Sequence, residues 1–311
     1  MVRSRTKAVL GIFGVIVATT IAGFWSVWGT IENFHEGWYT HSLWSNLLLA
    51  AVQYVGWPLG FAFLSCIAIW RPAIGSALFA LIGVGLNAFL FGFRNGPGIV
   101  LILVPCLMLA VLFGVGRTPK PRVAAEILLG VPMVIMVVIG TPLLWKVSHR
   151  LTAISSGALT WKAPSETMVW APPGPGWTTS GSSFAEAESI CDRLAADGKS
   201  IVAKPTYLWR LPTAEEAIHA LNRGGVPAGC RLGRTPGFQP CFNEPDKEAP
   251  LWNPYCPIIY WWTASHDQSG KVLRVAYNGY VLPVDPCANG YTGFRAVRVD
   301  TYPEAARSLF R

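Results

Sequence analysis

Acidic residues are scarce in the first half of this 311-residue chain, and long apolar runs are missing from the second half. Residues 1–147 contain nine Lys and Arg but only three carboxylates, at Glu32, Glu36 and Glu126. Residues 148–311 contain sixteen basic and fourteen acidic residues, and no stretch of the ~20 apolar residues that a membrane-crossing helix needs. The chain therefore divides near residue 148 into a membrane part and a water-soluble part.

Nucleic-acid motifs and basic stripes are also missing, although the formal net charge is +8. Most of this surplus lies in the membrane part, and the second part is nearly neutral. A nucleic-acid-binding protein usually concentrates Lys and Arg on one face of a domain. The composition therefore excludes nucleic acid as the expected partner and indicates the lipid bilayer instead.

Five apolar stretches predict an α-helical membrane domain of five transmembrane helices. They cover Ala8–Gly29, Asn46–Trp70, Pro72–Phe93, Gly98–Gly116 and Val123–Val147. Their interiors lack the charged residues that an ion or proton pathway needs, which argues against a transporter. We expect the spans to anchor the chain and to oligomerise, with small residues such as Gly83 and Gly85 allowing close packing. An alternative function is an accessory structural subunit of a larger membrane complex, which predicts an apolar patch along one side of the helices.

Basic residues beside the predicted spans alternate between the two sides of the membrane. Lys and Arg near helix ends are retained in the cytoplasm. One side collects Arg3, Arg5, Lys7, Arg71, Arg117, Lys120 and Arg122, whereas Arg94 stands alone between spans on the other. We therefore predict a multi-pass protein of the cell membrane with a cytoplasmic N-terminus. Residues from 148 onward are expected on the extracytoplasmic, periplasmic side.

A cleaved signal peptide is the alternative interpretation of the first span. Its basic start and apolar run fit such a peptide. However, the bulky residues Phe24, Trp25 and Trp28 follow Ala22 and Gly23, where a cleavage site needs small residues. We expect an uncleaved span, and the soluble part faces outward in either case.

The water-soluble part is expected to form one α+β domain over residues 183–311. Residues 148–182 are predicted as a linker with a first strand at Met168–Ala171. Two capping boxes begin helices, one at Ser183 extending to about Ala196 and one at Thr213 ending near Asn222–Gly225. Alternating apolar residues predict strands at Ile258–Ala264, Val272–Tyr277, Val281–Val284 and Phe294–Val299.

The order of several motifs in this domain resembles two related families. The motifs are Met168-Val-Trp170, Phe184-x-Glu-Ala-x-x-x-Cys191-x-x-Leu194, Trp209-Arg-Leu-Pro-Thr-Ala-Glu-Glu216, Tyr260-Trp-Trp-Thr-Ala-Ser265 and Gly293-Phe-Arg-Ala-Val-Arg298. They are similar to the C-terminal domain of bacterial collagen-like (Lcl-type) adhesins and, more distantly, to the formylglycine-generating or sulfatase-modifying-factor family. The resemblance implies a C-type-lectin-like fold in which Gly293–Arg298 pairs the C-terminus with the start of the domain.

Catalysis of the formylglycine-generating kind is not expected. Copper-dependent members need two closely spaced cysteines near the C-terminus, because thiolates bind Cu(I), and this chain has only Cys287 there. The Arg-Gly-Gly-Ser-Trp strand of those enzymes is replaced by Leu273–Tyr277. Related iron enzymes need several histidines, and the domain has only His149, His219 and His266. We therefore expect a binding module for a glycan, a peptide or an envelope protein.

Aromatic side chains are the candidate ligand-binding residues, because flat rings give large contact areas with little loss of entropy. The candidates are Trp209, Trp252, Trp262, Tyr277, Tyr280 and Tyr291. Strand alternation places one of Trp261 and Trp262 in the core. Glu244-Pro-Asp246 is an alternative, since calcium-dependent lectins hold sugar through a similar tripeptide, but their Trp-Asn-Asp partner is missing here.

Cysteines of the soluble part number five, and an oxidising compartment favours disulfides among them. We predict the pairs Cys230–Cys241 and Cys256–Cys287, with Cys191 buried on its helix. Four cysteines nevertheless allow three connectivities. No Cys or His spacing indicates a zinc site.

One ionisable cluster stands in the first outer loop of the membrane part. It comprises Glu32, His35, Glu36 and His41, of which Glu32 and His35 share a helix face. Such a cluster can bind a metal ion, which would make the chain a membrane-bound metal-dependent enzyme. The alternative is a solvated interfacial loop beside an aromatic belt of Trp38, Tyr39 and Trp44. No other cofactor is predicted.

Overall fold

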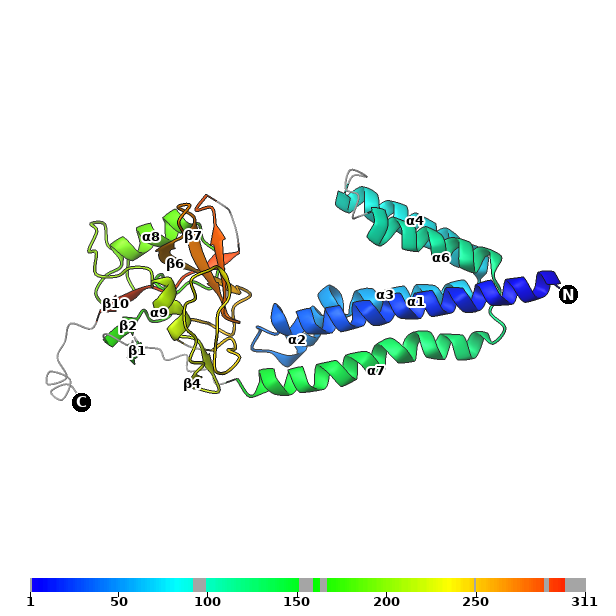
Figure 1. The fold of residues 1–311 in the computed structure, drawn as a ribbon, viewed down its shortest axis with the longest axis horizontal. Coiled ribbons are helices and arrows are strands. Elements are labelled where there is room, and N and C mark those ends of the chain that lie inside the picture. The colour runs from blue at the N-terminus through cyan, green and yellow to red at the C-terminus, as the bar shows by residue number, and fades with distance from the viewer. Residues whose placement is uncertain are drawn as a thin grey trace. The chain divides into compact units, whose positions relative to one another are not determined.

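The computed structural model describes residues 2–91, 99–150, 159–162, 167–248, 250–287 and 291–299. Outside these ranges lie the predicted span ends Phe93 and Gly98, the loop residue Arg94, and linker residues 151–158 and 163–166. The chain forms two compact units, Met1–Trp38 with Ser42–Lys146 and Tyr39–His41 with Val147–Arg311 (Figure 1). The long segment of the second unit begins one residue before the boundary predicted near residue 148.

The regular secondary structure in the described part of the first unit is helical. Its elements are α1 (Val2–His35), α2 (Leu43–Leu49), the π-helical turn η1 (Ala50–Tyr54), α3 (Gly56–Trp70), α4 (Pro72–Phe91), the π-helical turn η2 (Ile99–Leu103), α6 (Val104–Val115) and α7 (Pro121–Ser148). Three of these helices, within α1, α4 and α7, are long and apolar enough to cross a membrane. Leu43–Tyr54 and Gly56–Trp70 form a fourth such span if counted together, although they are bent by 56°. The stretch predicted from Gly98 to Gly116 is a shorter apolar helix, Ile99–Val115.

The bend within the second predicted span has a local cause. The chain passes from α2 through the wider turn η1, and π-helical turns are a common origin of kinks. Gly56 then begins α3 so close to the Ala51 carbonyl that a Cβ would overlap it. The apolar pattern alone does not reveal this break.

Small residues allow the helices of the first unit to pack closely. A Cβ on Gly83 of α4 would lie 2.6 Å from the Cβ of Cys106 on α6, and α4 and α6 run side by side (Figure 1). Across the same pair, the Ser76 hydroxyl donates to the Ala110 carbonyl at 2.5 Å. Gly83 thus has a packing role inside one copy of the chain, whereas Gly85 faces nothing within 4 Å.

The second unit contains two main sheets. Its strands are β1 (Leu159–Lys162), β2 (Thr167–Trp170), β3 (Asn222–Arg223), β4 (Val226–Pro227), β5 (Gly237–Phe238), β6 (Tyr260–His266), β7 (Val272–Ala276), β8 (Tyr280–Val284), β9 (Thr292–Gly293) and β10 (Val297–Val299). One sheet has the order β1-β2-β10 and the other the order β5-β8-β7-β6-β9. Val297 of β10 pairs with Trp170 of β2, which confirms that the C-terminal segment pairs with the start of the domain.

Both faces of β6 are covered by other parts of the unit. Trp261 packs into a core with Ile218 of α9 (Ala214–His219), and Trp262 packs into a second core with Phe184 of α8 (Phe184–Arg193). The rings of Trp262 and Phe184 meet edge to face with centroids 5.6 Å apart. The prediction that only one of these tryptophans is buried was therefore wrong, because a helix covers each face.

The two predicted capping boxes are present, at Ser183 with Glu186 and at Thr213 with Glu216. Both helices are shorter than expected, since α8 ends at Arg193 and α9 at His219. Beyond α9, β3 and β4 form a hairpin instead of a last helical turn. Gly224 and Gly225 make its turn with φ values of +62° and +74°, a conformation that favours glycine.

Glu216 joins the second capping box to the preceding strand-like segment. Its carboxylate accepts from both terminal nitrogens of Arg210 at 2.7 Å and from the Thr213 backbone N–H at 2.7 Å. Burial acts to raise the pKa of Glu216, but the bonds from Arg210 and Thr213 outweigh it and hold the pKa below its ordinary value. The charged form is therefore the one that stabilises the folded unit.

Replacing Glu216 by Gln is expected to lower stability by about 2 kcal/mol at neutral pH, the usual scale for hydrogen bonds to a charged group. A lowered folded-state pKa stabilises fully above the ordinary value of 4.5, and that contribution disappears as the pH falls through the folded-state pKa. The difference between wild type and E216Q should therefore shrink below pH 4.5. Thermal unfolding of the detergent-solubilised protein, followed by tryptophan fluorescence, measures it. Glu215→Gln, exposed on the same turn, serves as the control.

Candidate functional site

Three of the aromatic residues expected at a ligand-binding surface lie in the core instead. Trp209 is 2% exposed, and Trp252 and Trp262 are fully buried. The indole N–H of Trp209 donates to the Ala195 carbonyl at 2.8 Å, and that of Trp262 donates to the Ser182 carbonyl at 2.9 Å. The expectation of a binding role was wrong for these three, because the domain needs their area to fill its two cores.

The three tyrosines of the predicted surface are more accessible. Tyr277 is half-buried, with its ring edge to face with Trp252 and with the Lys247 ammonium 5.3 Å from its centroid. Tyr280 is half-buried on β8, and Tyr291 is 67% exposed. Tyr280 and Tyr291 are therefore available to a ligand.

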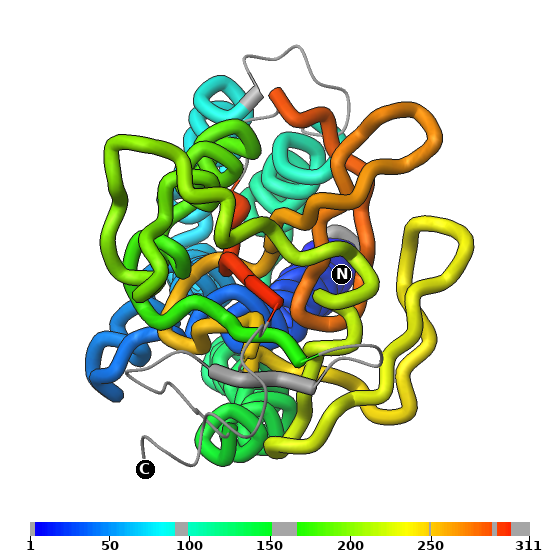
Figure 2. Tube along the Cα trace, turned by 90° about the vertical axis from the view of Figure 1, so that its left-hand side faces the viewer, coloured from blue at the N-terminus to red at the C-terminus, as the bar shows by residue number. Residues whose placement is uncertain are grey.

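The predicted disulfide between Cys230 and Cys241 is present, and it closes a short loop at the sheet margin. The buried side chain of Gln239 fills this loop. It accepts from the Gly233 N–H and donates to the carbonyls of Thr235 at 3.3 Å and Gly237 at 2.8 Å. Figure 2 shows this yellow segment projecting beside the orange strands. The covalent link and the amide together hold the loop in one conformation.

Two exposed phenylalanines flank the closing cysteine of this loop. Phe238 is 73% exposed and Phe242 is 83% exposed. Phe238 lies on β5, the edge strand of the larger sheet, and its ring meets Tyr280 edge to face at 4.8 Å between centroids. Phe242 packs over Gly229, where a Cβ would collide with its ring. We call Phe238, Phe242 and Tyr280 the aromatic edge.

Positive charge accompanies the aromatic edge. Arg231 and Arg234 are exposed on the disulfide loop, and residues 230–243 include no Asp or Glu. Guanidinium groups and aromatic rings are the side chains most enriched where proteins bind partners. The sequence pattern missed Phe238 and Phe242 because neither belongs to an alternating strand. One sequence signal could have identified Phe238, because an aromatic residue in a Pro- and Gly-rich loop between two cysteines has little chance of reaching a core.

The alternative calcium tripeptide has other partners. Asp246 accepts from Arg150, with an ion-pair distance of 3.0 Å, and Glu244 pairs with Arg223 at 3.3 Å. Because guanidinium groups engage both carboxylates, the tripeptide does not present them together to a cation.

The second predicted disulfide, Cys256–Cys287, does not form. Cys256 is buried and its thiol donates to the Thr179 carbonyl at 3.0 Å, whereas Cys287 is exposed. Cys191 is buried and free, and burial raises its pKa to about 12. The two cysteines instead lie in different surroundings, Cys256 in the core and Cys287 at the surface.

Three residues of the predicted metal cluster converge at the end of α1. Ligand atoms of Glu32, His35 and Glu36 all lie within 4.8 Å of one another, and the distance from His35 Nδ1 to Glu32 Oε2 is 3.4 Å. His41 does not join them. It belongs to the second unit, where its ring stacks on Tyr255 at 3.7 Å between centroids.

Comparisons with protein-family models, curated proteins and solved structures give no match for this chain. Two arrangements among the described residues have chemistry that points to a function. The first is the aromatic edge with its disulfide loop, and the second is the carboxylate and imidazole group of Glu32, His35 and Glu36.

The cysteine assignments predict a simple labelling pattern. Under native, non-reducing conditions a thiol reagent should modify Cys287 alone, because Cys66, Cys106, Cys191 and Cys256 are buried. Denaturation should expose these four, and reduction should then add Cys230 and Cys241. Mass spectrometry of labelled peptides measures each step. A native protein with no reactive Cys287 would instead support the Cys256–Cys287 bond.

Proposed function

We propose that this chain is an integral membrane protein that displays an extracytoplasmic recognition domain for a glycan, a peptide or an envelope protein. Five spans are part of the proposal: α1, the bent pair of α2 and α3, α4, the helix Ile99–Val115, and α7. The alternation of basic loop residues supports a cytoplasmic N-terminus and a periplasmic second unit. In this arrangement the first unit anchors the second.

The second unit is proposed to be a variant of the C-type-lectin-like fold. The ordered motifs shared with Lcl-type adhesin domains support this assignment, as does the pairing of β10 with β2 at the two ends of the unit. Arg210 and Arg295 have structural surroundings, since Arg210 binds Glu216 and Arg295 binds the Ala171 carbonyl. These contacts favour a recognition role over an inherited oxidase activity.

The observation that carries the proposal is the aromatic edge. Large apolar rings exposed to water lose hydration on binding, and their exposure is unfavourable unless a partner covers them. The Cys230–Cys241 bond and the Gln239 contacts fix the loop before a ligand arrives, which reduces the entropy lost on binding. Flat rings beside Arg231 and Arg234 suit the faces of sugar rings and the side chains of peptides.

A double substitution of the aromatic edge tests this function. Phe238→Ser with Phe242→Ser should weaken binding by about 30-fold or more, the effect typical of removing a central binding residue. The full-length protein in lipid nanodiscs is applied to glycan and envelope-peptide arrays, and the strongest hit is then titrated. Tyr207→Ser is the matched control, since Tyr207 is 73% exposed but lies against the end of α8, where its N–H bonds to Asp192.

If wild type and the double variant bind the strongest hit with equal affinity, the aromatic edge is not the ligand site. Failure of the wild-type protein to bind any arrayed glycan or peptide would contradict the recognition role. A loss of binding in the Tyr207→Ser control would indicate a general surface effect.

A metal-dependent enzyme is the second candidate function, and the convergence of Glu32, His35 and Glu36 favours it. Two carboxylates and one imidazole within 4.8 Å supply ligands of the kind that zinc and manganese accept. In such a site the three side chains would hold the ion and leave further positions for water or substrate. The site would lie at the end of a helix long enough to span a membrane.

Metal content distinguishes this candidate from the first. The full-length protein is equilibrated with Zn²⁺ or Mn²⁺, freed of unbound metal and analysed by elemental mass spectrometry. An enzyme site should retain about one ion per chain and lose it in His35→Ala/Glu36→Ala. His41→Ala should retain the ion, because His41 is outside the cluster. A wild-type protein without bound metal would eliminate the enzyme hypothesis.

A further inference from the structure

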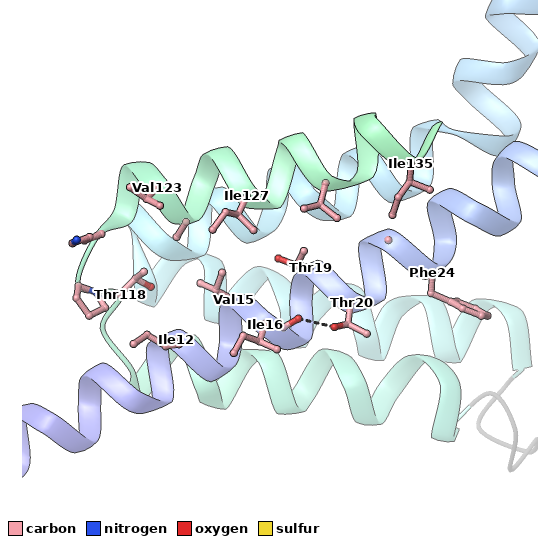
Figure 3. Close-up of a pocket in the computed structure, with 15 residues that line it drawn as sticks. Ile12, Val15, Ile16, Thr19, Thr20, Phe24, Thr118, Val123, Ile127 and Ile135 are labelled. Atoms are coloured by element: carbon pink, nitrogen blue, oxygen red, sulfur yellow. Dashed lines mark hydrogen bonds between the residues drawn. The ribbon is translucent and has the colours of Figure 1, made fainter. Parts of the chain in front are cut away.

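An apolar groove separates part of α7 from α1 in the first unit. Its volume is about 840 Å³, and its walls are formed by α1 residues such as Ile12 and Ile16 and by α7 residues such as Ile127 and Ile135. Figure 3 shows Val15 of α1 and Ile127 of α7 pointing into the space between the two helices. Beyond its first turns α7 has few buried residues, since Ala124, Ala125, Leu128 and Pro132 are those it buries.

One end of the groove is polar and basic. Thr118, Pro119 and Lys120 of the segment between α6 and α7 line this end. A second cavity of about 590 Å³, lined also by Ser4, Lys7, Ala8 and Arg117, shares Thr118 and Pro119 with the groove. The two cavities therefore adjoin, and one is apolar whereas the other is lined by the basic residues Lys7 and Arg117.

The basic end is held in place by backbone contacts. The Arg117 N–H donates to the Lys7 carbonyl at 2.8 Å. A Cβ on Gly11 would lie 2.5 Å from the Arg117 carbonyl carbon. The backbone of the segment between α6 and α7 is therefore in close contact with α1. Lys7 and Arg117, far apart in sequence, are thereby fixed beside each other.

Negative charge is nearly absent around these cations. The sequence has no Asp or Glu in residues 1–31 or 37–125, and Glu126 is the nearest carboxylate along the chain. Within the described residues, no carboxylate pairs with Lys7, Arg117 or Lys120. Two clustered cations without a protein counterion attract an anion from outside the chain.

We propose that this composite cavity binds an anionic glycerophospholipid. The phosphate lies at Lys7 and Arg117, and one acyl chain lies in the groove between α1 and α7. Basic cavities beside membrane helices match anionic headgroups in this way. A helix of a second copy would fill the apolar part but would leave the two cations without a partner, so charge complementarity favours the lipid. The inference rests on the proposed insertion of the first unit into a membrane, and not on the side that the second unit faces or on the recognition role.

The experiment measures lipid retention by the full-length protein. Delipidated protein is reconstituted with phosphatidylcholine and phosphatidylglycerol, extracted in mild detergent, and examined by native mass spectrometry. Wild type should retain phosphatidylglycerol in preference to phosphatidylcholine. Lys7→Gln/Arg117→Gln should weaken that retention about 25-fold, since each basic residue near an anionic lipid contributes about fivefold. Arg71→Gln, an exposed cation outside both cavities, should have no effect.

A second variant tests the acyl-chain part of the cavity. Ile127→Trp fills the groove and should displace the lipid while leaving Lys7 and Arg117 unchanged. Val137→Trp is its control, because Val137 is exposed on the same helix but does not line the groove. Equal retention of the two lipids, or unchanged retention in both cavity variants, would overturn the proposal. A dimer without bound lipid would also overturn the proposal, because it would indicate that a helix of a second copy fills the groove.

Topology is measured separately in the same proteins. A membrane-impermeant maleimide applied to intact spheroplasts should label Cys287 if the second unit is extracytoplasmic. Absence of that label with selective lipid retention would contradict the proposed sidedness but preserve the lipid site. Labelling of Cys287 without selective lipid retention would support the proposed sidedness and contradict the lipid site.

Discussion

The second unit depends on one buried cation, the guanidinium of Arg295. The side chain is 1% exposed, stacks 3.6 Å from the centroid of Trp177 and donates to the carbonyls of Ala171 and Pro250. Ala171 lies 124 positions away in sequence, so this residue ties the start of the unit to its end. Burial lowers the pKa of Arg295 to about 9, a sign of the cost of dehydrating it. The arrangement persists because the guanidinium donates hydrogen bonds to two carbonyls, which offsets part of the cost of burying its charge.

Closure by Arg295 and by the β2–β10 pairing explains where the aromatic residues lie. Once the ends of the unit are joined, the larger sheet has cores on both faces, and Trp209, Trp252 and Trp262 fill them. The sequence could not distinguish these rings from surface rings, because a tryptophan has the same local pattern in either place. The capping boxes and the Cys230–Cys241 bond were predictable, since each depends on residues close in sequence, three positions apart in the capping boxes and eleven in the disulfide. Burial of Cys256 was not, because its partner carbonyl at Thr179 is distant in sequence.

In the first unit, too, the sequence predicted some features, whereas others depend on contacts between distant residues. Hydropathy located the apolar helices, because a helix that enters a bilayer must be apolar along most of its length. It did not reveal the 56° bend before α3 or the contact of Gly83 with Cys106, which depend on backbone geometry and on a neighbouring helix. The groove between α1 and α7 was hidden for the same reason. Its basic end, by contrast, is made of residues whose charge already predicted a cytoplasmic location.

The length of α1 relates the two ionisable sites of the first unit. Lys7 and Glu32 are separated by 25 residues of one continuous helix, which at about 1.5 Å per residue is about 38 Å. The hydrocarbon core of a bilayer is only about 30 Å thick. A helix crossing such a core can therefore place Lys7 and Glu32 beyond its opposite surfaces. In the proposed membrane arrangement neither site therefore requires a charge in the hydrocarbon, because the length of α1 suffices to separate Lys7 and Glu32 by more than the thickness of the core.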